Sequence, residues 1–255
     1  MRIIARGSGI DEAAICHAEV SPKFIRLAER MNINRPIICD IGSRDGREGI
    51  FLMQRLNARQ LHVFEPNPVA AAMCRENLAR FSQSTGCDGV VFNELAITDE
   101  VSTRTFYPVD PIASGNKDIG FSSLYRLNPN YTRRRGPIVQ EEIKVNTTTL
   151  DAYFAGKEFP DILWMDVEGA ELEVLRGSTS VLRGARLIHL EVSFRPMQIG
   201  KPLFWEIQKY LAAMDYMFCG LMEVSTLKGF LYRYKLLPNL PWRLNAVFCR
   251  RHRHP

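Results

Sequence analysis

Four acidic residues stand at the carboxyl ends of four apolar runs in this chain of 255 residues. They are Asp40, Glu65, Asp166 and Glu191. Each apolar run predicts a buried strand of a parallel sheet, and parallel strands bring their carboxyl ends to one edge. Carboxylates gathered in one cleft repel one another, so they require a cationic ligand, hydroxyl donors or a metal ion. S-adenosylmethionine meets this requirement, because it carries a sulfonium, an ammonium and ribose hydroxyls.

The first apolar run leads into a turn with two glycines four residues apart, Gly42 and Gly46. Glycines let a backbone turn sharply and approach a ligand closely. The spacing is not GxGxxG, and no Gly-Lys-Ser/Thr follows, so a plain dinucleotide site and a P-loop are disfavoured. We expect the methionine part of the cofactor to face a set of residues at this turn. The set is Asp40, Gly42, Ser43, Arg44 and Gly46.

The second acid, Glu65, is placed like the residue that holds ribose hydroxyls in nucleotide-binding α/β folds. Pro66 follows it and prevents the strand from continuing. A third strand is predicted over residues 90–97. We expect Asn93, Ala96 and Ile97, in that strand, to lie along the adenine.

The sequence pattern alternates between expected strands and amphipathic helices, and this alternation predicts the fold that positions the acids. The expected parallel strands are residues 36–41, 61–65, 90–97, 161–166 and 187–192, and the closing pair is 216–219 and 244–249. The prediction is an α/β fold, a Rossmann-like, seven-stranded, mostly parallel sheet with helices on both faces and an antiparallel last strand pair. We expect one domain over residues 1–255, with an N-terminal helical extension over 1–35 whose helix at 21–32 packs near the mouth of the site.

Residues 98–149 depart from this alternation and predict an inserted region. Two edge strands are expected at 103–107 and 142–148, with an arginine-rich loop between them. An insertion of this length usually covers a site or selects a substrate. The apolar segment 220–241, between the two closing strands, is also expected to fold over the site.

Charge, cysteine content and apolar runs indicate the class of protein and its compartment. The formal charge of +5 lies largely in Arg133-Arg134-Arg135 and the tail 250–254, where a solvated loop and a frayed end are favoured over a phosphate- or lipid-binding patch. Six cysteines without a CxxC pair predict reduced thiols and a cytoplasmic protein. Nowhere do about 18 apolar residues run together, so no transmembrane segment is predicted. The oligomeric state is left open.

The motifs resemble, in their order, those of the FkbM family of class I methyltransferases. The matching segments are Asp40-Ile41-Gly42, Phe64-Glu65-Pro66-Asn67, Glu94-Leu95-Ala96-Ile97, Ser122-Ser123-Leu124, Thr149-Leu150-Asp151 and residues 164–171, Trp-Met-Asp-Val-Glu-Gly-Ala-Glu. The resemblance implies O-methylation, with S-adenosylmethionine, of a hydroxyl on a sugar, glycan or secondary metabolite. It also places Pro66, Asn67, Ser122 and Asp166 at the cofactor.

Two departures from the family pattern concern charge and bulk. Ser43 and Arg44 stand where the family has Ala-Asn. Trp164 and Met165 stand where it has Lys-Ile, which removes a cation beside the fourth strand.

Methyl transfer to a hydroxyl requires alignment of the two partners and removal of one proton. Asp166, Glu168 and Glu191 are the candidate catalytic residues. His189 points to the same face as Glu191 but one layer deeper, which favours a core histidine. The same acids could bind Mg²⁺, but no histidine pair at ligand spacing accompanies them, and we expect that no metal is required.

Two alternative functions stay open. An RNA ribose 2′-O-methyltransferase would need a Lys-Asp-Lys-Glu set, and the helix after Asp166 offers Arg176 instead of a lysine, so nucleic acid is disfavoured as a partner. A cofactor-binding scaffold without catalysis is the second alternative, and intact acids at four strand ends argue against it. The acceptor and the methylated hydroxyl are not identified by the sequence.

Overall fold

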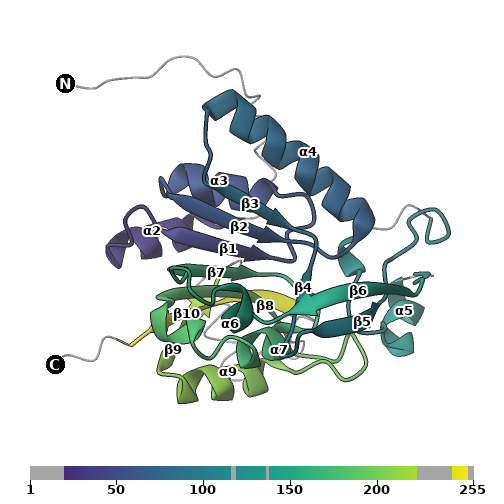
Figure 1. The fold of residues 1–255 in the computed structure, drawn as a ribbon. Helices are drawn as coiled ribbons and strands as arrows, with labels where there is room; N and C mark the ends of the chain where they lie inside the picture. The colour runs from purple at the N-terminus through teal and green to yellow at the C-terminus, as the bar shows by residue number, and fades with distance from the viewer. Residues whose placement is uncertain (1–19, 116–118, 136–137, 223–242, 252–255) are drawn as a thin grey trace.

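The computed structural model of this chain describes residues 20–115, 119–135, 138–222 and 243–251. A seven-stranded sheet lies at its centre, with helices on both faces (Figure 1). The strand order is β3-β2-β1-β7-β8-β10-β9. The parallel strands are β1 (Ile37–Ile41), β2 (Gln60–Phe64), β3 (Val90–Asn93), β7 (Ile162–Met165) and β8 (Leu187–Ser193). The last pair, β9 (Tyr216–Leu221) and β10 (Arg243–Arg250), is antiparallel, and β10 is also antiparallel to β8, so the predicted fold class is confirmed.

Helices cover the two faces of the sheet and explain why its inner strands are apolar throughout. One face carries α2 (Pro22–Arg30), α3 (Arg47–Arg55) and α4 (Pro68–Thr85). The other carries α6 (Leu150–Tyr153), α7 (Glu171–Arg176), α8 (Val181–Gly184) and α9 (Phe204–Ala213). Neighbouring residues of β1 point to opposite faces of the sheet. Ile38 packs in the core under α2, α3 and α4, and Cys39 packs in the core under α6 to α9. A strand covered on both sides must be apolar on both sides.

The first described helix, α2, covers a face of the sheet. Its N-cap is Ser21, whose side chain accepts a hydrogen bond from the backbone of Lys23. The ring of Phe24 packs edge-on against Trp164, with ring centroids 5.1 Å apart, and against His189, at 5.7 Å. None of its residues lines the pocket described below, so the predicted position near the mouth of the site is wrong. Residues 1–19 of the predicted extension lie outside the described part of the chain.

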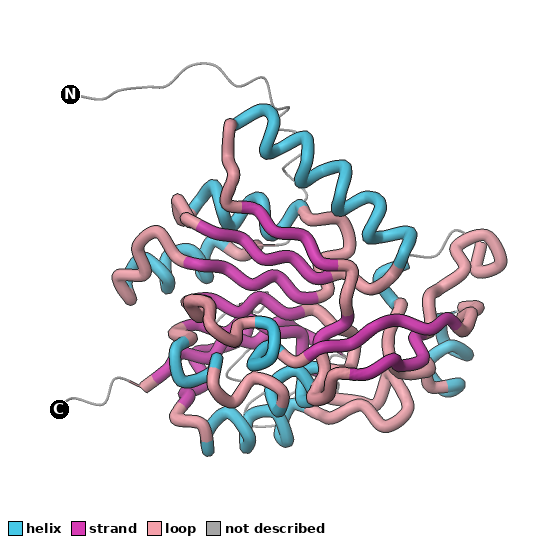
Figure 2. The backbone as a smooth tube through the Cα atoms, viewed as in Figure 1, coloured by secondary structure: helices cyan, strands magenta, loops and turns pink. Residues whose placement is uncertain are grey.

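The predicted third strand is two strands in two sheets. β3 ends at Asn93, and β4 (Ala96–Ile97) leaves the main sheet to pair with β6 (Ile143–Thr148). β6 also pairs antiparallel with β5 (Ser102–Phe106), which completes a three-stranded sheet beside the main one (Figure 2). The two predicted edge strands therefore exist, but they form their own sheet. The inserted region also contains η1 (Ile119–Phe121) and α5 (Pro129–Arg135).

Two cysteines form a disulfide, against the prediction that all thiols are reduced. Cys219 of β9 is bonded to Cys249 of β10. The antiparallel pairing of these strands brings together two residues that are 30 positions apart in the sequence. Cys39, Cys74 and Cys87 are free thiols.

No helix in the described residues has the length and the apolar character to cross a membrane.

Candidate active site

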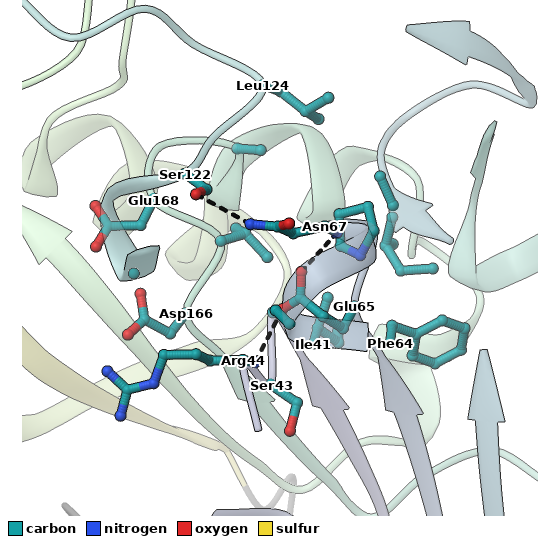
Figure 3. A pocket seen from close by; sticks show the side chains of 18 of the residues that line it. Ile41, Ser43, Arg44, Phe64, Glu65, Asn67, Ser122, Leu124, Asp166 and Glu168 are labelled. Atoms are coloured by element: carbon teal, nitrogen blue, oxygen red, sulfur yellow. Dashed lines mark hydrogen bonds between the residues drawn. The ribbon is translucent and has the colours of Figure 1, made fainter. Parts of the chain in front are cut away.

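A pocket lies where the carboxyl ends of β1, β2, β7 and β8 meet the inserted region (Figure 3). The acid-rich side contains Asp166 and Glu168, and Glu65 and Asn67 lie across from them. The strand ends contribute residues 41–45, 64–67, 95–97 and 166–168, and the insertion contributes 119–122. The predicted gathering of functional residues at this edge is thus observed for most of them.

The turn after β1 is pressed against the end of β7. Gly42 has φ +80°, and its N–H donates to the carbonyl of Phe64 at 2.9 Å. A Cβ on Gly42 would lie 2.0 Å from the backbone oxygen of Asp166, so only glycine permits this approach. Ser43 and Arg44 of the same turn line the pocket, and Arg44 has φ +55°. In Figure 3 the Arg44 side chain extends toward the side that holds Asp166.

Asp40, the first of the four predicted acids, does not line the pocket. Its carboxylate is buried behind the turn and accepts a 2.5 Å hydrogen bond from the hydroxyl of Ser43. Burial raises the pKa of Asp40 to about 8, although the hydrogen bond from Ser43 opposes the shift. The side chain points toward the start of α3, where a Cβ on Gly49 would be 2.6 Å from Asp40 Oδ2. Asp40 therefore supports the turn, and the expectation that it faces the pocket is wrong.

Two further predicted cofactor residues also lie outside the pocket wall. Gly46 is the N-cap of α3 and faces α4, where an added Cβ would be 3.2 Å from Leu78. Asn93 turns into the protein, and its amide donates to the carbonyl of Val63 at 3.2 Å and to the hydroxyl of Tyr153 at 3.3 Å. These backbone and side-chain partners replace the predicted contact with adenine.

Glu65 is buried at the pocket wall, and backbone amides hold both of its carboxylate oxygens. Oε2 accepts from the N–H of Arg44 at 2.9 Å, and Oε1 accepts from the N–H of Asn67 at 2.8 Å. Burial raises the pKa of Glu65 to about 7, while these two hydrogen bonds oppose the rise. The carboxylate is therefore fixed in direction and ready to accept from a hydroxyl donor.

Asn67 connects the end of β2 to the inserted region. It is the N-cap of α4, and its side-chain oxygen accepts from the backbone of Val69 at 3.1 Å. Its amide nitrogen donates to the hydroxyl of Ser122 at 3.1 Å, as the dashed line in Figure 3 shows. Asn67, Pro66 and Ser122 all line the pocket, as predicted from sequence.

An apolar wall forms part of the pocket lining. It consists of Leu95, Ala96, Ile97, Phe106 and Leu124. Ala96 and Ile97 reach this wall from the small sheet, so their predicted position at the site is observed although their predicted strand is not. A flat, apolar ring would be sheltered from water here.

Asp166, Glu168 and Glu191 form an acid cluster at the opposite end. One carboxylate oxygen from each lies within 4.8 Å of the others. Burial raises the pKa values of Asp166 and Glu191, the charge of Glu168 adds to this effect, and Arg243 opposes it. All three predicted catalytic residues are thus brought together in the pocket wall.

The three acids differ in their hydrogen-bond and ion-pair partners. Glu168 Oε1 accepts from Arg243 Nη1 at 2.6 Å, and Glu168 Oε2 accepts from Gln198 Nε2 at 3.0 Å. Glu191 Oε1 lies 3.0 Å from Arg243 Nη1. Asp166 Oδ1, in contrast, is buried without a hydrogen-bond partner in the described part of the chain. Asp166 as a residue lines the pocket, but this oxygen has no accessible surface of its own.

Sequence reasoning missed Arg243, Gln198 and Lys201. Arg243 is placed by strand register, because Asn245 lies opposite Glu191 in the antiparallel pairing of β10 with β8. A residue two positions from Asn245 shares its face of the sheet, so the register places Arg243 near Glu191. Gln198 and Lys201 come from the loop between β8 and α9, for which no local pattern indicates an inward direction.

Trp164 and His189 form a stacked pair inside the core. Their ring centroids are 3.4 Å apart, and the rings are almost parallel, with 2° between their planes. His189 is buried, so its predicted position in the core is confirmed, and burial lowers its pKa to about 3. Its Nδ1 has no hydrogen-bond partner in the described part of the chain, so the expectation that this histidine is fully hydrogen-bonded is wrong. Trp164 Nε1 donates to Glu48 Oε2 at 2.6 Å, and the indole thereby places a donor where the family pattern has a lysine.

Some predicted features fall outside the described residues. Most of the segment 220–241, expected to fold over the site, belongs to residues 223–242. The same holds for most of the basic tail and for the side chains of Arg133, Arg134 and Arg135.

The residues of the pocket suit S-adenosylmethionine. A fixed acid at Glu65 can accept from ribose hydroxyls, the apolar wall can cover an adenine, and the acid cluster with Asp166 can face a cation or a hydroxyl.

Comparison with known proteins gives a consistent picture. The family model described as "Methyltransferase FkbM domain" matches residues 40–218. The 2-O-methyltransferase NoeI of Sinorhizobium fredii is 34% identical over 191 residues, which are 72% of this chain and 72% of that protein. Methyltransferase sdnD of Sordaria araneosa is 28% identical over 163 residues, which are 56% of this chain and 61% of that protein.

Among solved structures, the methyltransferase FkbM of Methylobacillus flagellatus has a TM-score of 0.52 and 13% sequence identity. The match covers 84% of this chain, and this chain spans 43% of that longer one. A likeness at this identity shows the fold alone.

Proposed function

This chain belongs to the FkbM methyltransferase family, and from that premise we propose that it is an O-methyltransferase for a hydroxyl of a sugar, glycan or secondary metabolite. The relative NoeI, a 2-O-methyltransferase by name, supports oxygen as the methylated atom. The observation that carries the proposal is that one pocket holds both Glu65, fixed by two backbone amides, and the acid cluster that contains Asp166.

The cofactor in this proposal is S-adenosylmethionine, and each end of the pocket holds one part of it. Glu65 accepts hydrogen bonds from the ribose hydroxyls, because its two oxygens are fixed by the amides of Arg44 and Asn67. The wall that contains Ala96 and Ile97 covers the adenine. The turn at Gly42, Ser43 and Arg44 faces the methionine part. When bound, the cofactor supplies a methyl group on a sulfonium, which is a good leaving group.

Asp166 is the general base of the proposed reaction. It would take the proton from the acceptor hydroxyl and would itself become protonated. Bound S-adenosylmethionine would supply the methyl group for the acceptor oxygen and would leave as S-adenosylhomocysteine. A carboxyl with a raised pKa suits this task near neutral pH, because it holds the abstracted proton better than an ordinary carboxylate does.

In this proposal Glu168 and Glu191 orient the acceptor through hydrogen bonds and form ion pairs with Arg243. The oxygens of Glu168 are engaged by Arg243 and Gln198, so proton removal by Glu168 would require it to leave these partners. Glu191 is engaged by Arg243 in the same way. A sugar presents several hydroxyls, and carboxylates with fixed oxygens can orient them through hydrogen bonds.

Calorimetry with S-adenosylmethionine and S-adenosylhomocysteine is the first test. Micromolar binding of both is expected, and the affinity should be the same with added Mg²⁺ and with a chelator. Transfer of labelled methyl groups to a panel of methyl glycosides of hexoses and 6-deoxyhexoses then tests the acceptor class. A folded sample that binds neither cofactor form would overturn the proposal and favour a scaffold. Transfer to RNA but not to the glycosides would favour the ribose methyltransferase.

A further inference from the structure

A lysine without a hydrogen bond is buried behind the acid cluster. The side chain of Lys201 is 0% exposed, and its Nζ lies 4.0 Å from Glu191 Oε2. Within the described residues this ammonium has no hydrogen-bond partner. A buried, poorly solvated ammonium is costly unless negative charge surrounds it. Its position therefore requires an explanation beyond packing.

The backbone at Gly169, between Glu168 and Glu171, leaves room for the side chain of this lysine. An added Cβ on Gly169 would lie 3.3 Å from Lys201 Cδ and 3.4 Å from Lys201 Cγ. Gly169 also has φ +119°, a backbone conformation open to glycine. The aliphatic stem of Lys201 thus crosses the backbone between Glu168 and Glu171 and carries the ammonium to the inner side of the cluster.

More acids than cations meet at this place. Four acids raise the pKa of Lys201 by their negative charge, namely Glu171, Glu168, Glu191 and Asp166. Glu171 is fully buried, and its Oε1 accepts from the N–H of Gly169 at 3.0 Å while its Oε2 has no hydrogen-bond partner in the described part of the chain. Arg243 compensates the cluster from the pocket side, and Lys201 does so from the protein interior. Removal of the inner cation would leave buried acids that repel one another.

We propose that Lys201 is a positioning residue, the internal counter-ion that keeps Glu191 and Glu171 in place so that Asp166 alone exchanges a proton with the acceptor. The electrostatic part of this proposal concerns the protein by itself. The catalytic consequence rests on the proposed function.

Stability against pH separates a counter-ion from a packed side chain. In Lys201→Met the buried acids lose compensation, so their pKa values rise further above the unfolded values. The folded state then binds more protons than the unfolded state, and stability falls as pH rises. We expect the mutation to increase the unfolding equilibrium constant about tenfold more at about pH 8 than at about pH 5, the equivalent of one pKa unit. A packing defect alone would lower the free energy of unfolding by the same amount at both pH values.

A second mutation tests whether charge is the cause. Glu171→Gln removes one buried acid and keeps an oxygen that can accept from Gly169. The double variant Lys201→Met with Glu171→Gln should recover most of the stability lost near neutral pH. The matched control is Lys209→Met, an exposed lysine of α9, which should have little effect at any pH. If the single variant does not fold, a folded double variant supports the proposal, and failure of both to fold contradicts it.

Denaturant titrations of these variants at the two pH values give the result without any acceptor. Equal losses at both pH values, or no recovery in the double variant, would overturn the counter-ion role whatever the enzyme does. In the methyl-transfer assay, Lys201→Met should reduce kcat at least about tenfold and move the pH profile upward, because the acids then ionise at higher pH. An inactive wild-type protein would instead count against the proposed function and leave the stability result standing.

Discussion

Arg243 Nη1 lies 2.6 Å from Glu168 Oε1, although 75 positions separate the two residues in the sequence. Glu168 follows β7, and Arg243 begins β10, so the contact joins the middle of the chain to its last strand. The same guanidinium lies 3.0 Å from Glu191 Oε1, and its carbon lies 5.2 Å from the centre of the Phe121 ring. Arg243 thus connects two acids to the inserted region.

Replacement of Arg243 should lower the free energy of unfolding more than the loss of a surface ion pair does. The Arg243 side chain is 37% exposed, so water screens part of its charge, and we expect Arg243→Met to lower the free energy of unfolding by about 1–2 kcal/mol. The matched control is Arg75→Met, which removes an exposed pair with Glu94 at 2.7 Å and should cost less than about 1 kcal/mol. Urea titrations measure both. A similar loss in the two variants would contradict the role given to Arg243.

Asp166→Asn tests the proposed general base. Asparagine has nearly the shape of aspartate but cannot hold the acceptor's proton, so kcat should fall by about 10²–10⁴-fold. Calorimetry on the same variant should still detect S-adenosylmethionine. Glu191→Gln serves as the comparison, and we expect it to retain more activity. Product formation at the wild-type rate by Asp166→Asn, with cofactor bound, would assign the base elsewhere.

Glu65→Gln tests the proposed ribose contact. One backbone amide loses its carboxylate acceptor, and the ribose hydroxyls lose a charged acceptor, which is typically worth about 1.5–3 kcal/mol. Affinity for S-adenosylmethionine should therefore fall by about tenfold or more, while the fold is retained. Glu94→Gln, at the exposed end of β3, is the control and should bind normally. Unchanged affinity in Glu65→Gln would remove this residue from the cofactor site.

Cofactor binding should depend on pH through the same residue. The pKa of Glu65 in the free protein is about 7, and the ribose hydroxyls favour its ionised form. Below this pKa, binding must release a proton, so affinity should rise with pH by up to about tenfold per unit and level off above it. Calorimetry in two buffers with different ionisation enthalpies measures the proton release. Glu65→Gln should show a smaller release. An equal release in both proteins would point to another group.

Gly42→Ala tests the close approach between β1 and β7. The new methyl group would lie 2.0 Å from the backbone oxygen of Asp166, and the residue has φ +80°. Gly86→Ala is a control with similar strain, because Gly86 has φ +68° and nothing within 4 Å of an added Cβ. Gly86→Ala should cost about 1–2 kcal/mol, the cost of a left-handed conformation, and Gly42→Ala clearly more. Equal costs would mean that the contact relaxes easily.

The sequence by itself determined the fold class and most of the predicted residues that line the candidate pocket. Apolar runs that end in Glu65, Asp166 and Glu191 identify buried parallel strands, and parallel strands share one carboxyl edge, so these three acids had to meet. The motif of residues 164–171 identified the family. Local patterns suffice for such features because strand burial and turn chemistry depend on neighbouring residues.

The tertiary structure decided which of these residues face the pocket and which charges balance them. Asp40 is turned away because the hydroxyl of Ser43 and the start of α3 bind its carboxylate. Ala96 and Ile97 left the main sheet to pair with β6. Arg243 and Lys201 reach the acids from distant segments, and Cys219 meets Cys249 across neighbouring strands. Such contacts depend on strand register and loop paths, which are set by packing across the whole molecule and leave no local pattern in the sequence.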